Sequence, residues 1–183
     1  LLYAPGSIEP PFFTALAWMD HAGKETPLPE TTRVARFAPR VLPDNRRVAY
    51  SELYVDKDIR ILNTALGTED RASYEGQNAF PIWSRDGTAF AYVTDRSGQD
   101  EIWLGARAPR GGDRPLITQA DFGDDRTILL ASPSFSPDGQ RVAYQRNASR
   151  PIWPLRIWIS QTAGGPPVPL VPASHEGYQG APT

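Results

Sequence analysis

The sequence predicts an all-β protein, a β-propeller of about four blades in which each blade is a four-stranded antiparallel sheet. Three observations predict this fold: a phrase that recurs three times, two further strands that follow each copy, and almost no helical periodicity. The chain has 183 residues, and its 19 Pro residues are scattered along it, which argues against long helices. Four strands in a repeat of about 40 to 45 residues are typical of a propeller blade.

The repeated phrase is a pair of strands joined by a tight turn. Its copies begin at Pro39, Pro81 and Pro133, and they end at Tyr50, Tyr92 and Tyr144. The turns are Asp44-Asn45, Asp86-Gly87 and Asp138-Gly139. Asp-Gly between apolar runs is a strong hairpin signal, because the turn needs a positive φ that Gly adopts freely and Asn tolerates. We therefore expect these six residues to form the structural turns of the repeat.

A third strand follows each hairpin, and a fourth, outer strand follows the third. Corresponding third-strand positions lie at intervals of 42, 43 and 55 residues, and they are occupied by Trp18, Arg60, Trp103 and Trp158. The long last interval indicates an insertion near the fourth blade. We expect one propeller domain or segment over residues 1–183. Its approximate blades are 1–30, 31–76, 77–119 and 128–172, and 173–183 would start a further strand. The first blade is expected to lack its first strand.

Composition and missing motifs exclude several function classes. The formal net charge is −2, so a nucleic-acid-binding surface is not expected. The chain has no run of about 20 apolar residues, so membrane insertion is not expected. The chain has no Cys and two His residues, which leaves no disulfide and no plausible zinc site. No nucleophile elbow or P-loop is present. We therefore expect no enzyme activity, no cofactor and no metal ion.

Two short patterns suggest chemistry but have simpler interpretations. Asp121-Phe122-Gly123 spells the magnesium-binding motif of protein kinases, but the other kinase motifs are missing, so we interpret it as a chance match. The same loop contains Asp124 and Asp125, which with Asp121 offer oxygen ligands for calcium. The spacing of an EF-hand is absent, and we favour a solvated acidic loop.

The candidate contact residues lie in two loops. Trp153 lies in the insertion, flanked by Pro and outside the repeat register, and an exposed Trp is a good interface anchor. Four polar residues lie between the second and third strands of the third blade: Asp95, Arg96, Gln99 and Asp100. They are either a contact surface or a loop held by side-chain to backbone hydrogen bonds. The recurring Trp residues are interpreted as packing between blades rather than a ligand cage.

The third blade also carries a family resemblance. Its Pro81-Ile82-Trp83-Ser84-Arg85-Asp86-Gly87 turn and the stretch from Thr94 to Trp103 resemble TolB-like propellers, also called WD40-like repeats. The resemblance implies a bacterial, non-catalytic binding platform. The best-known members of that family are periplasmic and bind an outer-membrane lipoprotein, which favours an extracytoplasmic location. Related propellers gate prolyl-oligopeptidase-type peptidases or follow bacterial serine/threonine kinase domains.

These observations lead to a function hypothesis. We expect an interaction module that binds a protein or peptide partner through its face loops or its central channel. The alternatives are an accessory propeller of a larger peptidase or kinase, and a small-molecule sensor. Four blades are fewer than the six or more usual in the family, so a homodimer that completes an eight-bladed ring is a further hypothesis.

Overall fold

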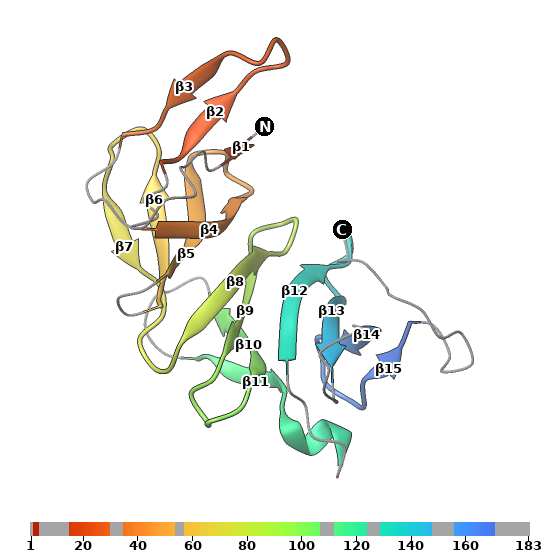
Figure 1. The fold of residues 1–183 in the computed structure, drawn as a ribbon. Coiled ribbons are helices and arrows are strands. Elements are labelled where there is room, and N and C mark those ends of the chain that lie inside the picture. The colour runs from red at the N-terminus through yellow and green to blue at the C-terminus, as the bar shows by residue number, and fades with distance from the viewer. Residues whose placement is uncertain are drawn as a thin grey trace. The chain divides into compact units, whose positions relative to one another are not determined.

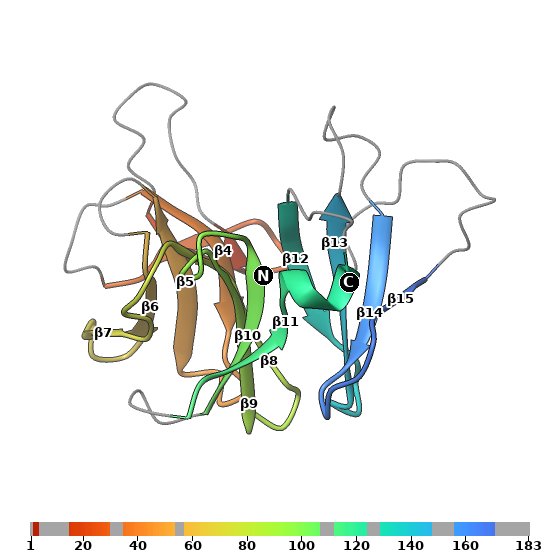
Figure 2. The same ribbon diagram turned by 90° about the horizontal axis from the view of Figure 1, so that it is seen from below.

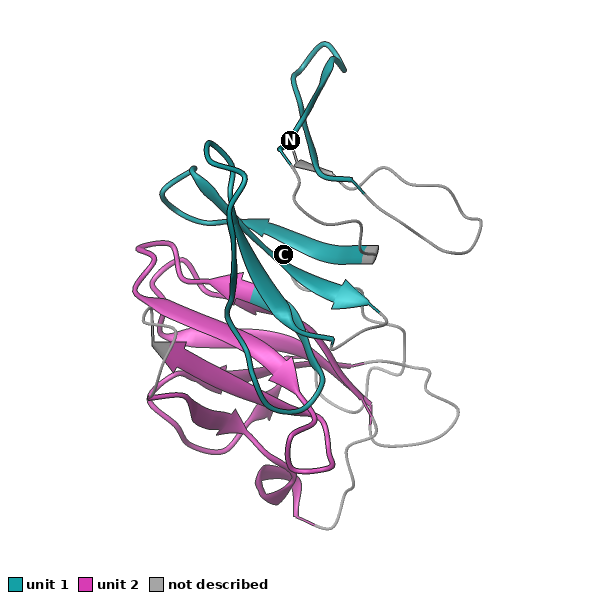
Figure 3. Cartoon of the chain, turned by 90° about the vertical axis from the view of Figure 1, so that its left-hand side faces the viewer, with its two compact units in different colours: residues 1–81 teal, residues 82–183 magenta. Residues whose placement is uncertain are grey.

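The computed structural model describes residues 2–3, 15–29, 35–53, 57–106, 112–123, 129–147 and 156–170. The chain divides into two compact units, residues 1–81 and 82–183 (Figure 3). The structure is built almost entirely of antiparallel strands (Figure 1).

In the first sheet, strands that follow one another along the chain are neighbours, and the order is β1-β2-β3. Its described strands are β1 (Leu2–Tyr3), β2 (Ala17–Met19) and β3 (Glu25–Pro27). The second sheet has the order β4-β5-β6-β7. Its strands are β4 (Ala35–Val41), β5 (Arg47–Leu53), β6 (Ile59–Asn63) and β7 (Glu69–Arg71).

The third and fourth sheets repeat this arrangement. The third consists of β8 (Asn78–Trp83), β9 (Ala89–Thr94), β10 (Glu101–Ala106) and β11 (Arg114–Ile117), in that order. The fourth consists of β12 (Leu129–Phe135), β13 (Arg141–Asn147), β14 (Arg156–Gln161) and β15 (Val168–Pro169), with β15 at its outer edge (Figure 2). Along the chain, the short 3-10 helix η1 (Gln119–Phe122) lies between β11 and β12.

The predicted all-β fold of four-stranded antiparallel sheets is confirmed. The first sheet has three strands among the described residues. Across the part of the chain that the structure describes, we find no helix with the length and hydropathy needed to cross a membrane.

The first strand of each four-stranded sheet carries a kink at the same place in the repeat. Ala38, Phe80 and Ser132 have φ values of 50°, 54° and 48°. Each of them precedes the Pro that opens the repeated phrase. The register of pairing shifts there in the second and fourth sheets, between Phe37 and Arg40 and between Ala131 and Ser134. A β-bulge leaves residues outside the ladder, so a Pro without an N–H can occupy an inner strand at this point.

The hairpin turns also repeat closely. Asn45, Gly87 and Gly139 have φ values of 55°, 69° and 71°. Their N–H groups donate to the carbonyls three residues earlier, on Leu42, Ser84 and Ser136. The connections between the paired strands have five residues and a single positive φ, so they are longer than two-residue hairpin loops.

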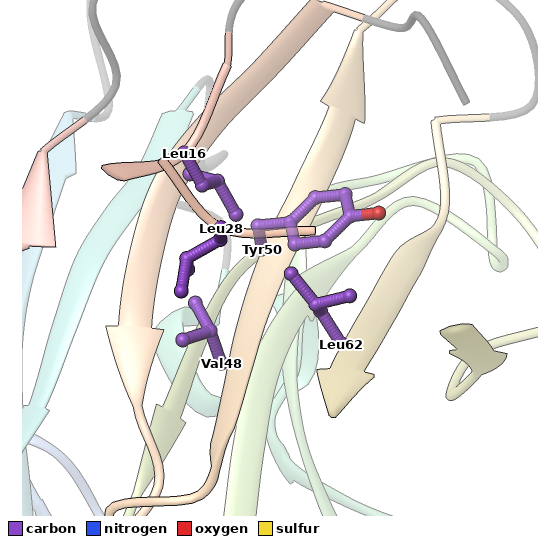
Figure 4. Close-up of a cluster of buried hydrophobic side chains, with 5 residues drawn as sticks. All are labelled: Leu16, Leu28, Val48, Tyr50 and Leu62. Atoms are coloured by element: carbon purple, nitrogen blue, oxygen red, sulfur yellow. The ribbon is translucent and has the colours of Figure 1, made fainter. Parts of the chain in front are cut away.

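A buried cluster joins the first and second sheets. Leu16 and Leu28 pack with Val48, Tyr50 and Leu62 of the second sheet (Figure 4). All five are at most 6% exposed. One face of the second sheet therefore packs toward the sheet before it. The opposite face carries Ser51, whose Oγ accepts the N–H of Phe80, in the first half of β8, at 3.0 Å.

Candidate functional site

A cleft of about 310 Å³ lies between the hairpin turns of the third and fourth sheets. Its lining consists of Ser84, Arg85, Asp86, Pro137, Asp138 and Gly139. The two turns approach closely, because a Cβ placed on Gly139 would lie 3.8 Å from the Cβ of Ser84. The same turn of two neighbouring repeats thus forms the two walls of one cleft.

Hydrogen bonds within each turn hold the carboxylates of the cleft. Ser84 Oγ donates to Asp86 Oδ1 at 2.6 Å, and the N–H of Thr88 donates to the same oxygen at 3.0 Å. Ser136 Oγ and the N–H of Gln140 donate to Asp138 Oδ1 at 2.5 and 3.0 Å. The Ser84 hydroxyl, together with donors from Thr88, lowers the pKa of Asp86 to about 2. The Ser136 hydroxyl likewise lowers the pKa of Asp138. Both side chains are therefore ionised at neutral pH.

The equivalent turn of the second sheet uses a different donor. Leu42 replaces the serine there, and Arg47 Nε donates to Asp44 Oδ2 at 2.7 Å. Partial burial raises the pKa of Asp44, but hydrogen bonds from the N–H of Arg46 and from Arg47 outweigh it and lower the pKa overall. An ionised Asp that organises its own turn is therefore common to all three hairpins.

Arg85 is a charged residue of the cleft whose side chain takes no part in the hydrogen bonds of the turn. Its side chain is exposed, and it makes no hydrogen bond or ion pair with the residues that the structure describes. The carboxylates beside it already accept two or more donors each. The guanidinium has five N–H donors in a fixed fork that matches a carboxylate, so it is the group in the cleft best suited to hold a ligand.

The four predicted loop residues lie between β9 and β10, and three of them make contacts close by in the chain. The carbonyl of Asp95 accepts the N–H of Gly98, and Gln99 Nε2 donates to the carbonyl of Gly98. Arg96 Nη2 donates to the hydroxyl of Tyr92 at 2.6 Å, and its guanidinium lies 4.0 Å from the ring centroid of Trp103. These contacts suit the structural interpretation of the loop, and its binding role stays a prediction.

Asp100 connects two sheets. Its Oδ2 accepts the N–H of Leu130, the second residue of β12, at 3.1 Å. Burial raises the pKa of Asp100, and the charge of Asp95 adds to this, although the bond from Leu130 opposes it. In the second sheet the corresponding bond uses backbone alone, because the N–H of Asn78 donates to the carbonyl of Lys57 at 2.6 Å.

A tyrosine on the second strand of each four-stranded sheet lies in a buried polar group. Tyr50 donates to Glu69 Oε1 and Tyr92 donates to Asp113 Oδ2, each at 2.7 Å. The Tyr144 hydroxyl is 3.2 Å from Ser160 Oγ. Burial raises the pKa of all three tyrosines above its usual range, so their hydroxyls keep their protons. The three tyrosine hydroxyls therefore make their hydrogen bonds within their own repeats.

The recurring Trp residues differ in their surroundings. Trp18 packs against the cluster between the first and second sheets, as the interpretation of packing between blades predicts. Trp103 Nε1 donates to Glu101 in its own strand, and Trp158 contacts Phe122 edge-on with ring centroids 5.5 Å apart. Trp153, the predicted interface anchor, lies outside the described residues.

The Asp121-Phe122-Gly123 motif shapes a local turn. Asp121 Oδ2 accepts the N–H of Thr118 at 2.7 Å and so caps η1. The guanidinium of Arg146 lies 3.7 Å from the ring centroid of Phe122. Asp124 and Asp125 lie outside the described residues. Within the ranges that the structure describes, His, Cys, Asp and Glu residues form no group of three or more that could hold a metal ion.

Sequence reasoning identified the turns as structural and did not recognise the cleft that they form. The signal was present, because equivalent turns of consecutive repeats lie at the same end of neighbouring sheets. Arg85 was visible as a departure from the turn of the fourth sheet, where Pro137 occupies the corresponding position.

No protein-family model matches this sequence. A protein from Bacillus subtilis (strain 168), described as the uncharacterized peptidase YuxL, is 30% identical over 120 residues. That match covers 61% of this chain and 17% of YuxL.

Solved structures show the same fold. TolB from Acinetobacter baumannii matches with a TM-score of 0.71 and 18% identity, over 93% of this chain and 41% of that chain. A putative TolB from Agrobacterium tumefaciens has a TM-score of 0.74 and 20% identity, over 93% and 61% of the two chains. A structure from a study of two prolyl endopeptidases has a TM-score of 0.61 and 18% identity, over 87% and 28%. The predicted TolB-like propeller fold is confirmed, and the chain spans less than two thirds of each of these proteins.

Proposed function

We propose that this TolB-like propeller is a non-catalytic module that binds a protein or peptide partner at the cleft between the hairpin turns of the third and fourth sheets. The observation that carries the proposal is Arg85, an exposed guanidinium in a cleft whose carboxylates are already used by their own turns. Binding residues commonly lie on loops that a rigid scaffold positions.

The partner should present a carboxylate. A guanidinium pairs with a carboxylate through two parallel hydrogen bonds, and such charge-assisted bonds are stronger than neutral ones. Pro137 and Gly139 on the opposite wall offer a surface with little side-chain bulk, against which an extended peptide can lie. An acidic side chain or a free carboxyl terminus of a peptide meets both requirements.

Selection from a library of short random peptides displayed on phage tests this proposal. Peptides enriched on the wild-type protein should be acidic, and they should lose binding to Arg85→Glu. Arg46→Glu is the matched control, because Arg46 is an exposed arginine on the equivalent turn of the second sheet. Equal loss in both variants, or enrichment without acidic residues, would refute the proposal.

A second candidate function is an accessory propeller of a larger peptidase. It is favoured by the 30% identity to YuxL and by the similarity in structure to a prolyl endopeptidase. It predicts that the natural gene also encodes a hydrolase domain, with a catalytic serine in a strand-to-helix turn. Sequencing the coding region on both sides of this segment tests it, and a gene without such a domain would exclude it.

A further inference from the structure

The partner proposed above brings a carboxylate to Arg85, and we infer that it also carries a basic side chain, which binds Asp138 on the opposite wall of the cleft. The partner is then a peptide segment in which an acidic and a basic residue are adjacent. This inference rests on the proposed function, because it concerns the same cleft between the turns of the third and fourth sheets. It adds the second charge of the partner and the position of that charge in the partner's sequence.

The charges that line the cleft do not suit a ligand that is only acidic. Arg85 contributes a positive charge, whereas Asp86 and Asp138 each contribute a negative charge. Both aspartates are ionised at neutral pH, because the serine hydroxyl of each turn lowers the pKa of its aspartate. A carboxylate that binds Arg85 is therefore repelled by two like charges nearby. A cationic group on the same ligand offsets this repulsion.

In the second and third sheets, the turn aspartate uses both of its carboxylate oxygens. Asp44 Oδ1 accepts the N–H of Arg46, and its Oδ2 accepts Arg47 Nε at 2.7 Å. Asp86 Oδ2 accepts the hydroxyl of Thr88 at 2.9 Å, in addition to the hydrogen bonds at its Oδ1. In both turns the second oxygen therefore already has a donor from the same turn.

In the fourth sheet, the turn uses only one oxygen of Asp138. Both donors, the Ser136 hydroxyl and the N–H of Gln140, bind Oδ1. Arg141 occupies the position that corresponds to Arg47, and its charge adds to the hydrogen bonds that lower the pKa of Asp138. Among the residues that the structure describes, however, neither Arg141 nor any other group donates to Asp138 Oδ2. The exposed carboxylate of Asp138 therefore keeps an oxygen with which a basic group of a ligand can pair.

The positions of the two charges indicate how the partner's residues are spaced. Arg85 belongs to the turn of the third sheet and Asp138 to the turn of the fourth, so they come from opposite walls. The structure gives no ion pair between them. Successive side chains of an extended peptide point to opposite sides. In a peptide that lies between the two walls, neighbouring residues therefore face Arg85 and Asp138.

Peptides selected on the wild-type protein from the random phage library test this inference. We expect a basic residue next to the acidic one more often than in the unselected library. One enriched peptide is then synthesised with a fluorescent label, together with a version in which Gln replaces the basic residue. Fluorescence anisotropy should show that the Gln peptide binds the wild type about three- to tenfold more weakly, between the effects of an exposed ion pair and of a charged hydrogen bond.

Asp138→Asn is the matching change in the protein. Asn keeps the oxygen that accepts Ser136 and Gln140 and removes the charge, so the two peptides should bind this variant equally. Asp44→Asn, on the equivalent turn of the second sheet, is the control and should keep the difference between the peptides. Circular dichroism should show that both variants keep the wild-type fold. The comparison of the two peptides on the wild-type protein decides the question even if a variant does not fold.

Three results would overturn the inference: enriched peptides without an adjacent basic residue, equal binding of the two peptides to the wild type, or equal effects of Asp138→Asn and Asp44→Asn. If binding in those cases still depends on Arg85, the proposed function stands and only this inference has failed. If no acidic peptide is enriched, or if binding survives Arg85→Glu, the proposed function fails and this inference fails with it.

Discussion

The backbone N–H of Leu130 donates to Asp100 Oδ2 at 3.1 Å, and this bond joins the loop before β10 to the first strand of the fourth sheet. Leu130 is 1% exposed, so water cannot replace the acceptor if it is removed. The side chain of Asp100 in the third repeat therefore helps to hold the first strand of the fourth repeat in place.

Replacing Asp100 tests this connection. Asp100→Ala leaves the buried N–H of Leu130 unpaired and should reduce the free energy of unfolding by about 1 to 3 kcal/mol. Asp100→Asn keeps an oxygen acceptor and should be more stable than the alanine variant. Urea denaturation at pH 7 measures both. If the two variants are equally stable, the hydrogen bond contributes nothing measurable.

The stability of the protein should also depend on the charge of Asp100. Burial raises the pKa of Asp100 above its ordinary value of 3.8, so the folded state holds the proton more tightly than the unfolded state. Its contribution to stability is therefore present at low pH and is lost as pH rises through the folded pKa. In Asp100→Asn this fall should disappear. Denaturation curves between pH 3 and 7 compare the two proteins, and parallel pH profiles would contradict the assignment.

Ser84 should control the acidity of Asp86. In Ser84→Ala the carboxylate of Asp86 loses its shortest hydrogen bond, and its pKa should rise from about 2 toward the ordinary value of 3.8. A depressed pKa contributes stability above about pH 4 that is lost as pH falls toward 2, so the variant should show less of this acid-dependent loss. Carboxyl carbon NMR titration reads the pKa directly. Asp138, held by Ser136, should titrate unchanged as the internal control.

The guanidinium of Arg146 lies 3.7 Å from the ring centroid of Phe122 and 5.2 Å from that of Trp158. A double-mutant cycle with Arg146→Met and Phe122→Leu isolates the first contact. We expect a coupling free energy of about 0.5 to 2 kcal/mol, the usual range for a cation over an aromatic ring. Thermal unfolding of the four proteins measures it. Additive effects of the two substitutions would show that η1 is held by other contacts.

We expect the protein to keep its stability when Gly replaces Asn45 and to lose stability when Ala does. The φ of Asn45 is 55°, a conformation in which a Cβ is unfavourable for most residues and in which Asn is better accepted. Asn45→Ala should therefore destabilise by about 1 kcal/mol, whereas Asn45→Gly should change stability by less than about 0.5 kcal/mol. Chemical denaturation compares them. A stable alanine variant would mean that the turn changes its conformation at little cost.

Much of this fold could be predicted from sequence because the signals are local and recur. The Asp-Gly and Asp-Asn turns have the positive φ that these residue pairs indicate, at Asn45, Gly87 and Gly139. An outer strand follows the third strand of the repeat as predicted, for example at Arg114–Ile117 and Glu25–Pro27. Turn chemistry and alternating apolar residues act over a few positions, so a single sequence is enough to read them.

Other features depended on contacts between repeats, which no local pattern encodes. Asp100 reads as one polar loop residue among four, and its acceptor role requires Leu130, thirty positions away along the chain. Ser84 and Gly139 read as separate turns, yet they approach each other across one cleft.

Ile117 and Leu170 are both apolar residues on outer strands, and the sequence alone determined that each belongs to a sheet face. Only the tertiary structure decided that one is buried and the other exposed, because burial depends on whether another sheet lies against that face.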